Sequence, residues 1–458
     1  MPETPLRVII IGAGTGGLCL AQGLRKAGGI TVDVYERDRT RTDGLFGYRV
    51  GISPDGNRAL KDCLPPELFQ TYVASTAATP FWSVMLTEQL QELFSQSMDD
   101  FYGGTPPKDL ASREFSVSRM TLRQVLLTGI EDSVHFEKTF TRFTQNDDGT
   151  VTAFFTDSSS ATGDILVGAD GSGSRVRRQY LPQAKLVDSG LIGVTGKVPL
   201  TPETKALLPE KSRSAVSMVF APRGFFCILH VMEFPWGQDG VPKQGIGSSD
   251  TELLAKWPGL LYDNTRDYIM WGFSTAKRYL PDNVLQLSGK ELQDLVLRLT
   301  ADWHPNLREL FARTDPGAVF PINIRTSEPL PLWQPSNVTL IGDAIHTMTP
   351  GRGVGANTAL RDARLLCRQL IKVRDGQQSV VDAVRQYEAR MVEYGFDAVL
   401  ESRKQMSGNS PMHKPIIGRL ALAGMRTGMR TINHVPAIKK RMAASTEAYR
   451  GLGRDDQD

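Results

Sequence analysis

Residues 7–27 read RVIIIGAGTGGLCLAQGLRKA. The initial β-branched run predicts a buried parallel strand, and residues 18–27 have the composition of a helix. The turn between them has the spacing GxGxxG, in which Gly12 permits the tight turn, Gly14 lets the backbone approach a pyrophosphate and Gly17 lets the helix pack on the strand. The N–H groups of the helix N-terminus can bind the phosphates. This stretch predicts the first βαβ unit of an α/β fold that binds a dinucleotide.

A second strand is predicted at residues 31–35 and ends at Glu36, nineteen residues after Gly17. A carboxylate in this position can accept hydrogen bonds from both hydroxyls of a ribose, and it disfavours a 2′-phosphate. The strand, the helix and the acid together favour a dinucleotide site over a glycine-rich turn without function. They do not distinguish NAD from FAD.

Two later segments repeat the order of strand, glycine-rich loop and helix. The first, LVGADGSGSRVR at residues 166–177, places Asp170 at the C-terminal end of a strand, where open α/β sheets bind ligands. The second, VTLIGDAIHTMTPGRGVGAN at residues 338–357, places Asp343 at a strand end, where it can accept a hydrogen bond from a ribityl hydroxyl. Its loop from Pro350 onward leads to a helix N-terminus, whose dipole can stabilise negative charge on a bound ring.

Together the three motifs resemble the signatures of the single-component FAD-dependent aromatic hydroxylases, the group A flavoprotein monooxygenases. These signatures are GxGxxG, GADGxxSxVR and GDAxHxxxPxxGxGxNxAxxDA, and the resemblance covers about residues 6–400. It implies an α/β protein with a Rossmann-like FAD-binding domain of the glutathione-reductase type, similar to p-hydroxybenzoate hydroxylase, a mostly antiparallel β-sheet substrate domain and C-terminal helices. The implied divisions are residues 1–75, 108–185 and 286–375 for the FAD-binding domain, 76–107 for an insertion of the substrate domain, 186–285 for the substrate-binding sheet and 376–458 for a helical region.

By position, the resemblance assigns ten residues to the cofactor FAD. The ADP half would be held by Gly12, Gly14, Gly17 and Glu36, and Arg119 of an RxxL pattern would lie near the phosphates. Asp343 would bind the ribityl chain, and Asp170 would serve the flavin side or the NADPH side. The pyrimidine edge of the isoalloxazine would be faced by Gly355, Ala356 and Asn357. For Arg123, one helical turn after Arg119, we expect a surface salt bridge.

Two residues are candidates for the reaction centre. Arg49 lies in GYRVGI, residues 47–52, which resembles the family's strand that reaches the flavin or the nicotinamide, and we expect it to contact NADPH or substrate. Pro350, at the start of the third-motif loop, is the second candidate. We expect His346 to be a structural loop residue, because acid–base catalysis needs a partner that the sequence does not identify. No catalytic base and no metal site are predicted.

The reaction implied by the resemblance is a monooxygenation. NADPH or NADH would reduce the flavin, O₂ would add at C4a, and the hydroperoxide would transfer one oxygen atom to a hydrophobic small molecule. The substrate class implied is aromatic or similar to a polyketide, alkaloid or terpenoid of secondary metabolism, with hydroxylation, epoxidation and Baeyer–Villiger insertion all open. An FAD-binding reductase of the same fold and a non-catalytic flavin-binding protein that shields an intermediate remain alternatives. A halogenase is disfavoured, because the six tryptophans form no WxW pair.

Residues 191–278 are predicted to form mostly strands, separated by Gly and Pro. Five aromatic residues in this part would suit a hydrophobic ligand or, equally, a packed core: Phe220, Phe225, Phe226, Trp271 and Phe273. A capping box at residues 288–291 predicts the start of a helix.

Composition is that of a soluble globular protein, with 458 residues of which 40% are hydrophobic and 22% charged. A formal net charge of +3 gives no argument for nucleic acid. The four cysteines lie far apart without a CxxC pair, which predicts buried free thiols in a reducing compartment. Since no signal-peptide pattern and no long apolar run is found, we expect a cytoplasmic protein that is a monomer or homodimer.

Residues 403–446 contain nine Lys or Arg residues and no Asp or Glu. Apolar residues recur among them at partly helical spacing: Ile416, Ile417, Leu420, Leu422 and Met425. The preferred interpretation is a C-terminal helix that packs across the FAD domain with its charges solvated. The alternative is a peripheral contact with an anionic membrane or a partner.

Overall fold

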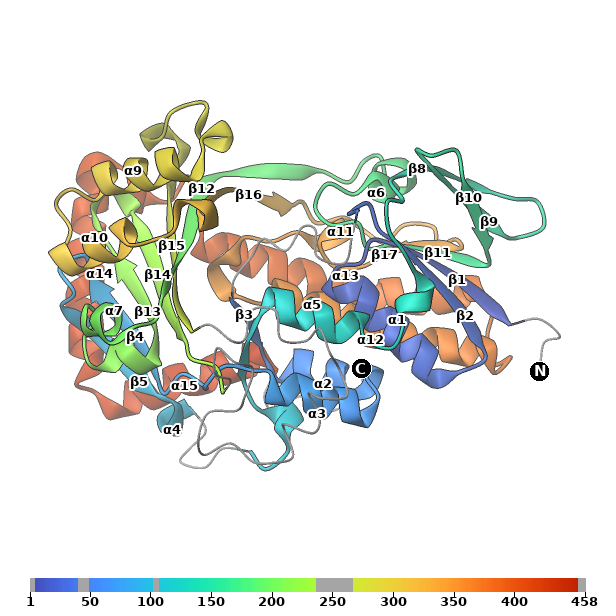
Figure 1. Ribbon diagram of the computed structural model, residues 1–458, viewed down its shortest axis with the longest axis horizontal. Helices are drawn as coiled ribbons and strands as arrows, with labels where there is room; N and C mark the ends of the chain where they lie inside the picture. The colour runs from blue at the N-terminus through green and yellow to red at the C-terminus, as the bar shows by residue number, and fades with distance from the viewer. Residues whose placement is uncertain (1–4, 40–48, 102–106, 236–266, 452–458) are drawn as a thin grey trace.

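The structure, a computed structural model, describes residues 5–39, 49–101, 107–235 and 267–451. A parallel sheet with its helices and a larger antiparallel sheet lie at opposite ends of the molecule (Figure 1). Strand β12 (Leu186–Pro199) runs from one end toward the other. Part of the predicted GYRVGI strand and residues 236–266 of the expected substrate domain lie outside the described residues.

The parallel sheet has the strand order β17-β11-β1-β2-β7. Its members are β1 (Leu6–Ile11), β2 (Ile30–Tyr35), β7 (Val134–His135), β11 (Ile165–Gly168) and β17 (Val338–Leu340). Each neighbouring pair is parallel. The carboxyl ends of β1, β11 and β17 therefore meet at one edge of the sheet, which is the edge where open α/β sheets bind ligands. The three sequence motifs come together there.

Helices cover this sheet and join its distant segments. Helix α1 (Thr15–Ala27) follows β1 and packs beside α12 (Gly355–Arg374), which in turn contacts α2 (Pro54–Cys63) and α13 (Val380–Gln405). All four cysteines are buried and free, as the sequence predicted. Three of them, Cys19, Cys63 and Cys367, lie close together where α1, α2 and α12 meet. A small antiparallel sheet of β8 (Phe140–Gln145), β9 (Val151–Phe155) and β10 (Ser160–Gly163) packs against the same core.

The second sheet has seven strands in the order β16-β12-β15-β14-β13-β4-β5. The strands besides β12 are β4 (Trp82–Thr87), β5 (Glu92–Ser97), β13 (Ala215–Phe220), β14 (Phe226–Met232), β15 (Tyr268–Ala276) and β16 (Phe320–Ser327). Only the pair of β13 and β4 is parallel among these described strands. The prediction of a mostly antiparallel substrate sheet is confirmed.

The two faces of this sheet differ. One face packs on α9 (Gly289–Leu299) and α10 (Pro305–Ala312) in a core that includes Phe225, Trp271 and Phe273. Because side chains alternate across a strand, their neighbours face the other way. That second face, the open face, carries side chains that are only half-buried: Met218, Phe220, Phe226, Ile228 and Met270. Of the five aromatic residues considered for ligand contact, three are therefore core residues.

The chain returns to the parallel sheet later than we expected. Residues 286–375 were assigned to the FAD-binding domain, yet α9, α10 and β16 belong to the layer of the seven-stranded sheet. The chain re-enters the parallel sheet at β17. The capping box that opens α9 is confirmed, because Ser288 Oγ accepts from the Glu291 N–H and the Glu291 carboxylate accepts from the Ser288 N–H at 2.8 Å.

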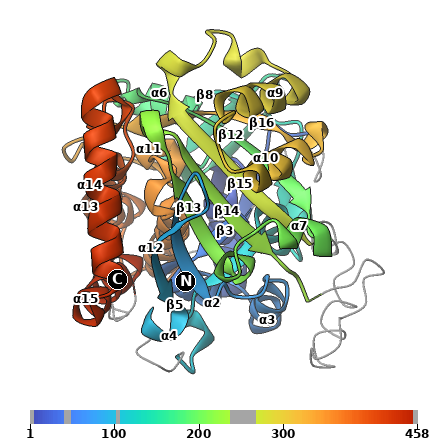
Figure 2. The ribbon, with the colours of Figure 1, turned by 90° about the vertical axis from the view of Figure 1, so that its left-hand side faces the viewer.

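The C-terminal helices lie at the far side of the antiparallel sheet. Helix α14 (Pro415–Asn433) contacts the edge strand β5 and continues into α15 (Pro436–Arg450) (Figures 1 and 2). The expectation that this helix packs across the FAD domain was wrong, since its contacts are with the substrate sheet. Among the residues that the structure describes, no helix has the length and apolarity to cross a membrane.

Candidate cofactor site and active site

The glycines of the first motif hold β1, α1 and the second motif in contact. Gly12 has φ +108°, and a Cβ added there would lie 2.5 Å from the carbonyl oxygen of Ala169. A Cβ at Gly17 would lie 2.3 Å from the Gly12 carbonyl oxygen. At Gly14 the nearest atom would be 4.0 Å away, so this glycine leaves open space beside the helix N-terminus. The backbone is thus exposed where a pyrophosphate would approach.

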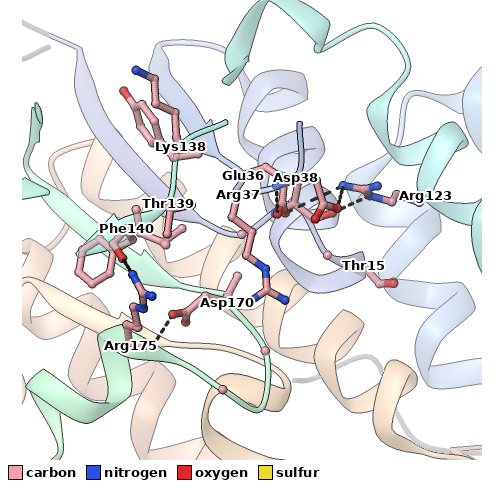
Figure 3. Close-up of a pocket in the computed structure, with 18 of the residues that line it drawn as sticks. Thr15, Glu36, Arg37, Asp38, Arg123, Lys138, Thr139, Phe140, Asp170 and Arg175 are labelled. Atoms are coloured by element: carbon pink, nitrogen blue, oxygen red, sulfur yellow. Dashed lines mark hydrogen bonds and ion pairs between the residues drawn. The ribbon is translucent and has the colours of Figure 1, made fainter. Parts of the chain in front are cut away.

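That open space belongs to a cavity of about 460 Å³ at the carboxyl edge of the parallel sheet. The ends of β1 and β2, the start of α5 (Arg119–Leu127) and the loop after β11 line it (Figure 3). Six of its lining residues are basic: Arg37, Arg119, Arg123, Lys138, Arg175 and Arg178. A cavity with this charge, next to a helix N-terminus, suits a diphosphate.

Glu36 lies at the end of β2, where the sequence predicted it, and is 8% exposed. Its Oε2 accepts from the Ala13 N–H at 2.6 Å, and its Oε1 accepts from the Asp38 N–H at 3.1 Å. A carboxylate has about four acceptor positions, so Glu36 can still accept from ribose hydroxyls. The backbone bonds fix its orientation toward the cavity.

Arg123 is part of this site and not a surface residue. Its side chain is 12% exposed. Its Nε donates to the Ala13 carbonyl at 3.2 Å and its Nη2 donates to Asp38 Oδ2 at 3.1 Å (Figure 3). The ion pair that we expected exists, but it is formed inside the cavity wall. Arg123 therefore ties α5 to the turn that precedes α1.

Asp170 begins the loop between β11 and α6 (Arg175–Tyr180). Its Oδ2 accepts from the Arg175 N–H at 2.7 Å, which caps the helix. Arg175 in turn donates to the Phe140 carbonyl at 2.8 Å (Figure 3). The second oxygen, Oδ1, is buried and has no hydrogen-bond partner in the described part of the chain. A ligand hydroxyl directed at Asp170 would satisfy it.

Asp343 is the first residue of α11 (Asp343–His346), directly after Gly342. Its side chain is open to solvent although protein groups surround it. Desolvation raises the pKa of Asp343, while the positive charges of His346 and Arg119 oppose that shift. Because solvent still reaches the carboxylate, the desolvation effect will be largest when a ligand covers it.

His346 has the partner that the sequence did not reveal. Its Nε2 lies 2.6 Å from Asp362 Oδ2, and the two side chains are 1% and 0% exposed. Asp362 also accepts from the Gly342 N–H at 2.7 Å and the Tyr394 hydroxyl at 2.6 Å. Burial would lower the pKa of His346, but the charge and hydrogen bond of Asp362 outweigh it and raise the pKa. This buried cluster holds α11, α12 and α13 together.

The N-terminus of α12 presents the backbone N–H groups of Gly355, Ala356 and Asn357, which have no partner within a helix. The Asn357 side chain points elsewhere, toward β3 (Arg49–Ile52). Its Oδ1 accepts from the Ser53 N–H at 2.8 Å and its Nδ2 donates to the Gly51 carbonyl at 2.9 Å. Only the backbone of this residue is therefore directed toward a ring placed at the helix N-terminus.

Arg49 begins β3, which lies between the two ends of the molecule (Figure 1). Its Nε donates to Ser116 Oγ at 3.2 Å. Burial, followed by the positive charge of Arg450, lowers the pKa of Arg49 to about 10, so it remains a cation at neutral pH. The other candidate, Pro350, is exposed and starts the short helix η8 (Pro350–Arg352) that precedes α12.

Arg49 lies near His230 on the open face of the substrate sheet. His230 is 1% exposed, and neither of its ring nitrogens has a hydrogen-bond partner among the residues that the structure describes. Burial, and then the charge of Arg49, lower the pKa of His230 well below its usual value. The site therefore contains a buried imidazole that is neutral at neutral pH and that lies within the electrostatic range of a cation.

Comparison with known proteins identifies the family. A family model for the FAD binding domain matches residues 299–398. The chain is 33% identical over 409 residues to the dual O-methyltransferase/FAD-dependent monooxygenase of Cercospora beticola, with 84% of this chain and 44% of that protein covered. It is also 33% identical to a protein of Photorhabdus luminescens whose crystal structure is described as an FAD-containing monooxygenase, with a TM-score of 0.72 and 88% and 98% of the two chains covered. The chain belongs to the group A FAD-dependent monooxygenases.

A second solved structure gives a useful comparison for this chain. The crystal structure of a Klebsiella pneumoniae protein complexed with FAD and uric acid has a TM-score of 0.70 and 25% identity, with 95% of this chain and 96% of that chain covered. The fold of this chain is thus that of its relatives. The chain spans less than half the length of the Cercospora relative.

The described residues that line the cavity fit the diphosphate and ribose of FAD. The basic cavity beside Gly14 suits the diphosphate, and Glu36 suits the ribose. The buried Oδ1 of Asp170, which has no hydrogen-bond partner among the described residues, could accept a hydrogen bond from FAD. The α12 N-terminus would stabilise negative charge on the pyrimidine edge of the flavin.

Three residue roles were missed by sequence reasoning. Arg123 is four residues after Arg119, so the i, i+4 rule could have placed both on one face of α5. Asp362 is the final acid of the third motif, and that motif could have suggested it as the partner of His346. For His230 no sequence signal existed, because its importance depends on Arg49, which lies far away in the chain.

Proposed function

We propose that this protein uses FAD and a reduced nicotinamide, NADPH or NADH, to insert one oxygen atom from O₂ into a hydrophobic small molecule. The observation that carries the proposal is the position of β3. Asn357 binds β3 to the N-terminus of α12, where the flavin ring would lie, and Arg49 of β3 lies near His230 of the substrate sheet. The cofactor region and the open sheet face thus converge on one strand.

Bound FAD would supply the chemistry, by accepting electrons from the nicotinamide and activating O₂ for transfer of one oxygen atom. The chain's own groups would bind and orient. The N–H groups at the start of α12 would hold the negative charge of a reduced ring. The half-buried apolar side chains of the open face would exclude water and bind an apolar substrate.

We further propose that His230 and Arg49 bind an oxygen atom of the substrate. A buried imidazole with two unsatisfied nitrogens is costly, by about 1–3 kcal/mol per lost hydrogen bond, and a substrate hydroxyl or carbonyl would remove that cost. Arg49 would stabilise negative charge on the same oxygen. A hydrophobic molecule with one polar end, such as an aromatic polyketide, matches this arrangement.

The test is turnover by the FAD-loaded protein with a panel of phenols, quinones, indoles and polyenes. NADPH and NADH consumption and oxygen uptake would be followed together, and ¹⁸O₂ would label the product. We expect at least one compound to raise both rates and to gain one labelled oxygen atom. Nicotinamide oxidation without oxygen uptake would favour a reductase, and bound FAD with no response to a broad panel would favour a flavin-binding protein.

For the substrate contact, His230→Asn is the informative variant. We expect it to keep the FAD content of the wild type and to raise KM about tenfold or more for the compound found above. The control is the same compound with its hydroxyl or carbonyl removed, for which wild type and variant should differ little. An equal loss for both compounds would show that His230 acts only in packing.

A further inference from the structure

The outward face of α14 is unusual for a surface helix. Its first two turns expose three large aliphatic side chains: Ile416 at 76%, Ile417 at 53% and Leu420 at 70%. The positions that continue this face along the helix are also exposed, and none is charged: Ala423, Gly424, Thr427 and Thr431. Surface helices normally direct charged and polar residues to solvent. Here the solvent-facing stripe carries aliphatic side chains at one end and small uncharged residues beyond them, and the exposed Arg419 and Arg430 lie along its border.

The inward contacts of α14 fix this orientation. Leu422 is 4% exposed, and a Cβ at Gly418 would lie 2.3 Å from the Met412 carbonyl oxygen. Arg426 donates to the Phe220 carbonyl at 2.7 Å and pairs with Glu88 of the loop after β4. Asn433 Oδ1 accepts from the Ser95 N–H of β5 at 3.0 Å. The helix is therefore held at several points along its length, and the aliphatic side chains cannot turn inward.

The surroundings of this face are positively charged. Lys414 and Arg419 are exposed at its N-terminal end and have no ion-pair partner in the described ranges. Residues 403–446 contain no acid. The acids of the sheet beneath are already paired, Glu88 with Arg426 and Glu92 with Lys211. An anionic surface would meet cations without meeting uncompensated carboxylates.

We propose that the outward face of α14 binds the surface of an anionic membrane. The three aliphatic side chains would enter the interface between headgroups and acyl chains, and Lys414 and Arg419 would contact anionic headgroups. The contact is peripheral, because the described helices include none suited to span a bilayer. A second copy of the chain is disfavoured as the occupant, because a twofold contact would bring the same cations face to face. The proposal is independent of the oxygen chemistry.

The test is flotation of the FAD-loaded protein with two kinds of vesicle, phosphatidylcholine alone and phosphatidylcholine with one third phosphatidylserine. We expect co-flotation with the anionic vesicles at low salt, about tenfold more than with the neutral ones, and a decrease at high salt. The double variant Ile416→Ser/Leu420→Ser should lose most of this binding. Lys414→Ser/Arg419→Ser should lose the preference for the anionic vesicles.

The matched control is Leu332→Ser, because Leu332 is 60% exposed but lies outside α14. It should float like the wild type, and all variants should keep the same FAD content and far-UV circular dichroism. Absence of flotation by the wild type would overturn the proposal, as would equal flotation by the Ile416→Ser/Leu420→Ser variant. Light scattering that shows a dimer lost in that variant, without flotation of the wild type, would assign the face to a second copy instead.

Discussion

At the scale of single residues, Gly12 has no room for a side chain. An alanine there would combine a backbone at φ +108° with a Cβ 2.5 Å from the Ala169 carbonyl oxygen. We expect Gly12→Ala to lower the free energy of unfolding by about 2 kcal/mol or more and to reduce FAD content, measured by urea unfolding and flavin absorbance. The control is Gly149→Ala at φ +83° with no neighbour within 4 Å, which should cost about 1 kcal/mol and leave FAD content unchanged.

The His346–Asp362 pair predicts a dependence of stability on pH. The folded-state pKa of His346 is raised above its ordinary 6.5, so its stabilisation is complete below pH 6.5 and is lost as pH rises through the folded pKa. We expect His346→Gln to destabilise the protein by about 3 kcal/mol at acidic pH and by less at alkaline pH, from urea midpoints. Equal destabilisation at both pH values would contradict the charged pair. His135→Gln, which removes an exposed pair with Asp33, should have little effect at either pH.

At the scale of elements, the two residues that cap helix α6 allow a structural role to be distinguished from a cofactor contact. Asp170 Oδ2 and Ser174 Oγ both cap this helix, through the N–H groups of Arg175 and Arg177. Replacing either by alanine should cost about 1 kcal/mol of stability. Only Asp170→Ala should also weaken FAD binding, because only Asp170 has the buried free oxygen. Fluorescence titration with FAD would compare them, and equal affinities would assign Asp170 to the cap alone.

The two faces of the seven-stranded sheet make a second prediction at this scale. Trp271 is fully buried against α10, and its Nε1 donates to Thr314 Oγ1 at 2.7 Å. We expect Trp271→Ala to cost about 3–5 kcal/mol, whereas Phe226→Ala on the open face should cost about 1 kcal/mol and instead raise KM for the hydrophobic substrate. Thermal unfolding and steady-state kinetics would measure the two effects. A large stability loss in Phe226→Ala with unchanged KM would contradict the assignment of that face.

At the scale of the whole molecule, FAD binding should stabilise the folded state. Its site is built from segments on β1, β2, β11, β17 and their helices, so binding favours the folded state. Free FAD at about 100 times its Kd should stabilise the protein by about 2.7 kcal/mol. FMN lacks the adenosine half for which the cavity of about 460 Å³ is suited, and should stabilise less. Scanning calorimetry with each ligand tests this. Equal stabilisation by FAD and FMN would show that the cavity does not contribute to FAD binding.

Features that depend on neighbouring residues in the chain could be predicted from the sequence, whereas features that depend on long-range contacts could not. The motif at Gly12 and the capping box at Ser288 depend on residues within a few positions, so their geometry could be predicted. The burial of Arg123 depends on Ala13, which is 110 residues away, and could not. The domain boundary near residue 286 was misplaced because the sequence of helix α9 has the same amphipathic pattern whichever of the two sheets the helix packs on.

The order of strands in the parallel sheet has a consequence for synthesis on the ribosome. Strand β11 pairs with β1 on one side and with β17 on the other, and β17 is made only at residues Val338–Leu340. About 170 residues separate the end of β11 from β17, so at about 5–20 residues per second that edge of β11 stays unpaired for on the order of 10–30 seconds. FAD cannot be captured fully before α12 emerges. The nascent chain therefore passes through a long stage without cofactor, during which the unpaired edge of β11 is the part most in need of protection by chaperones.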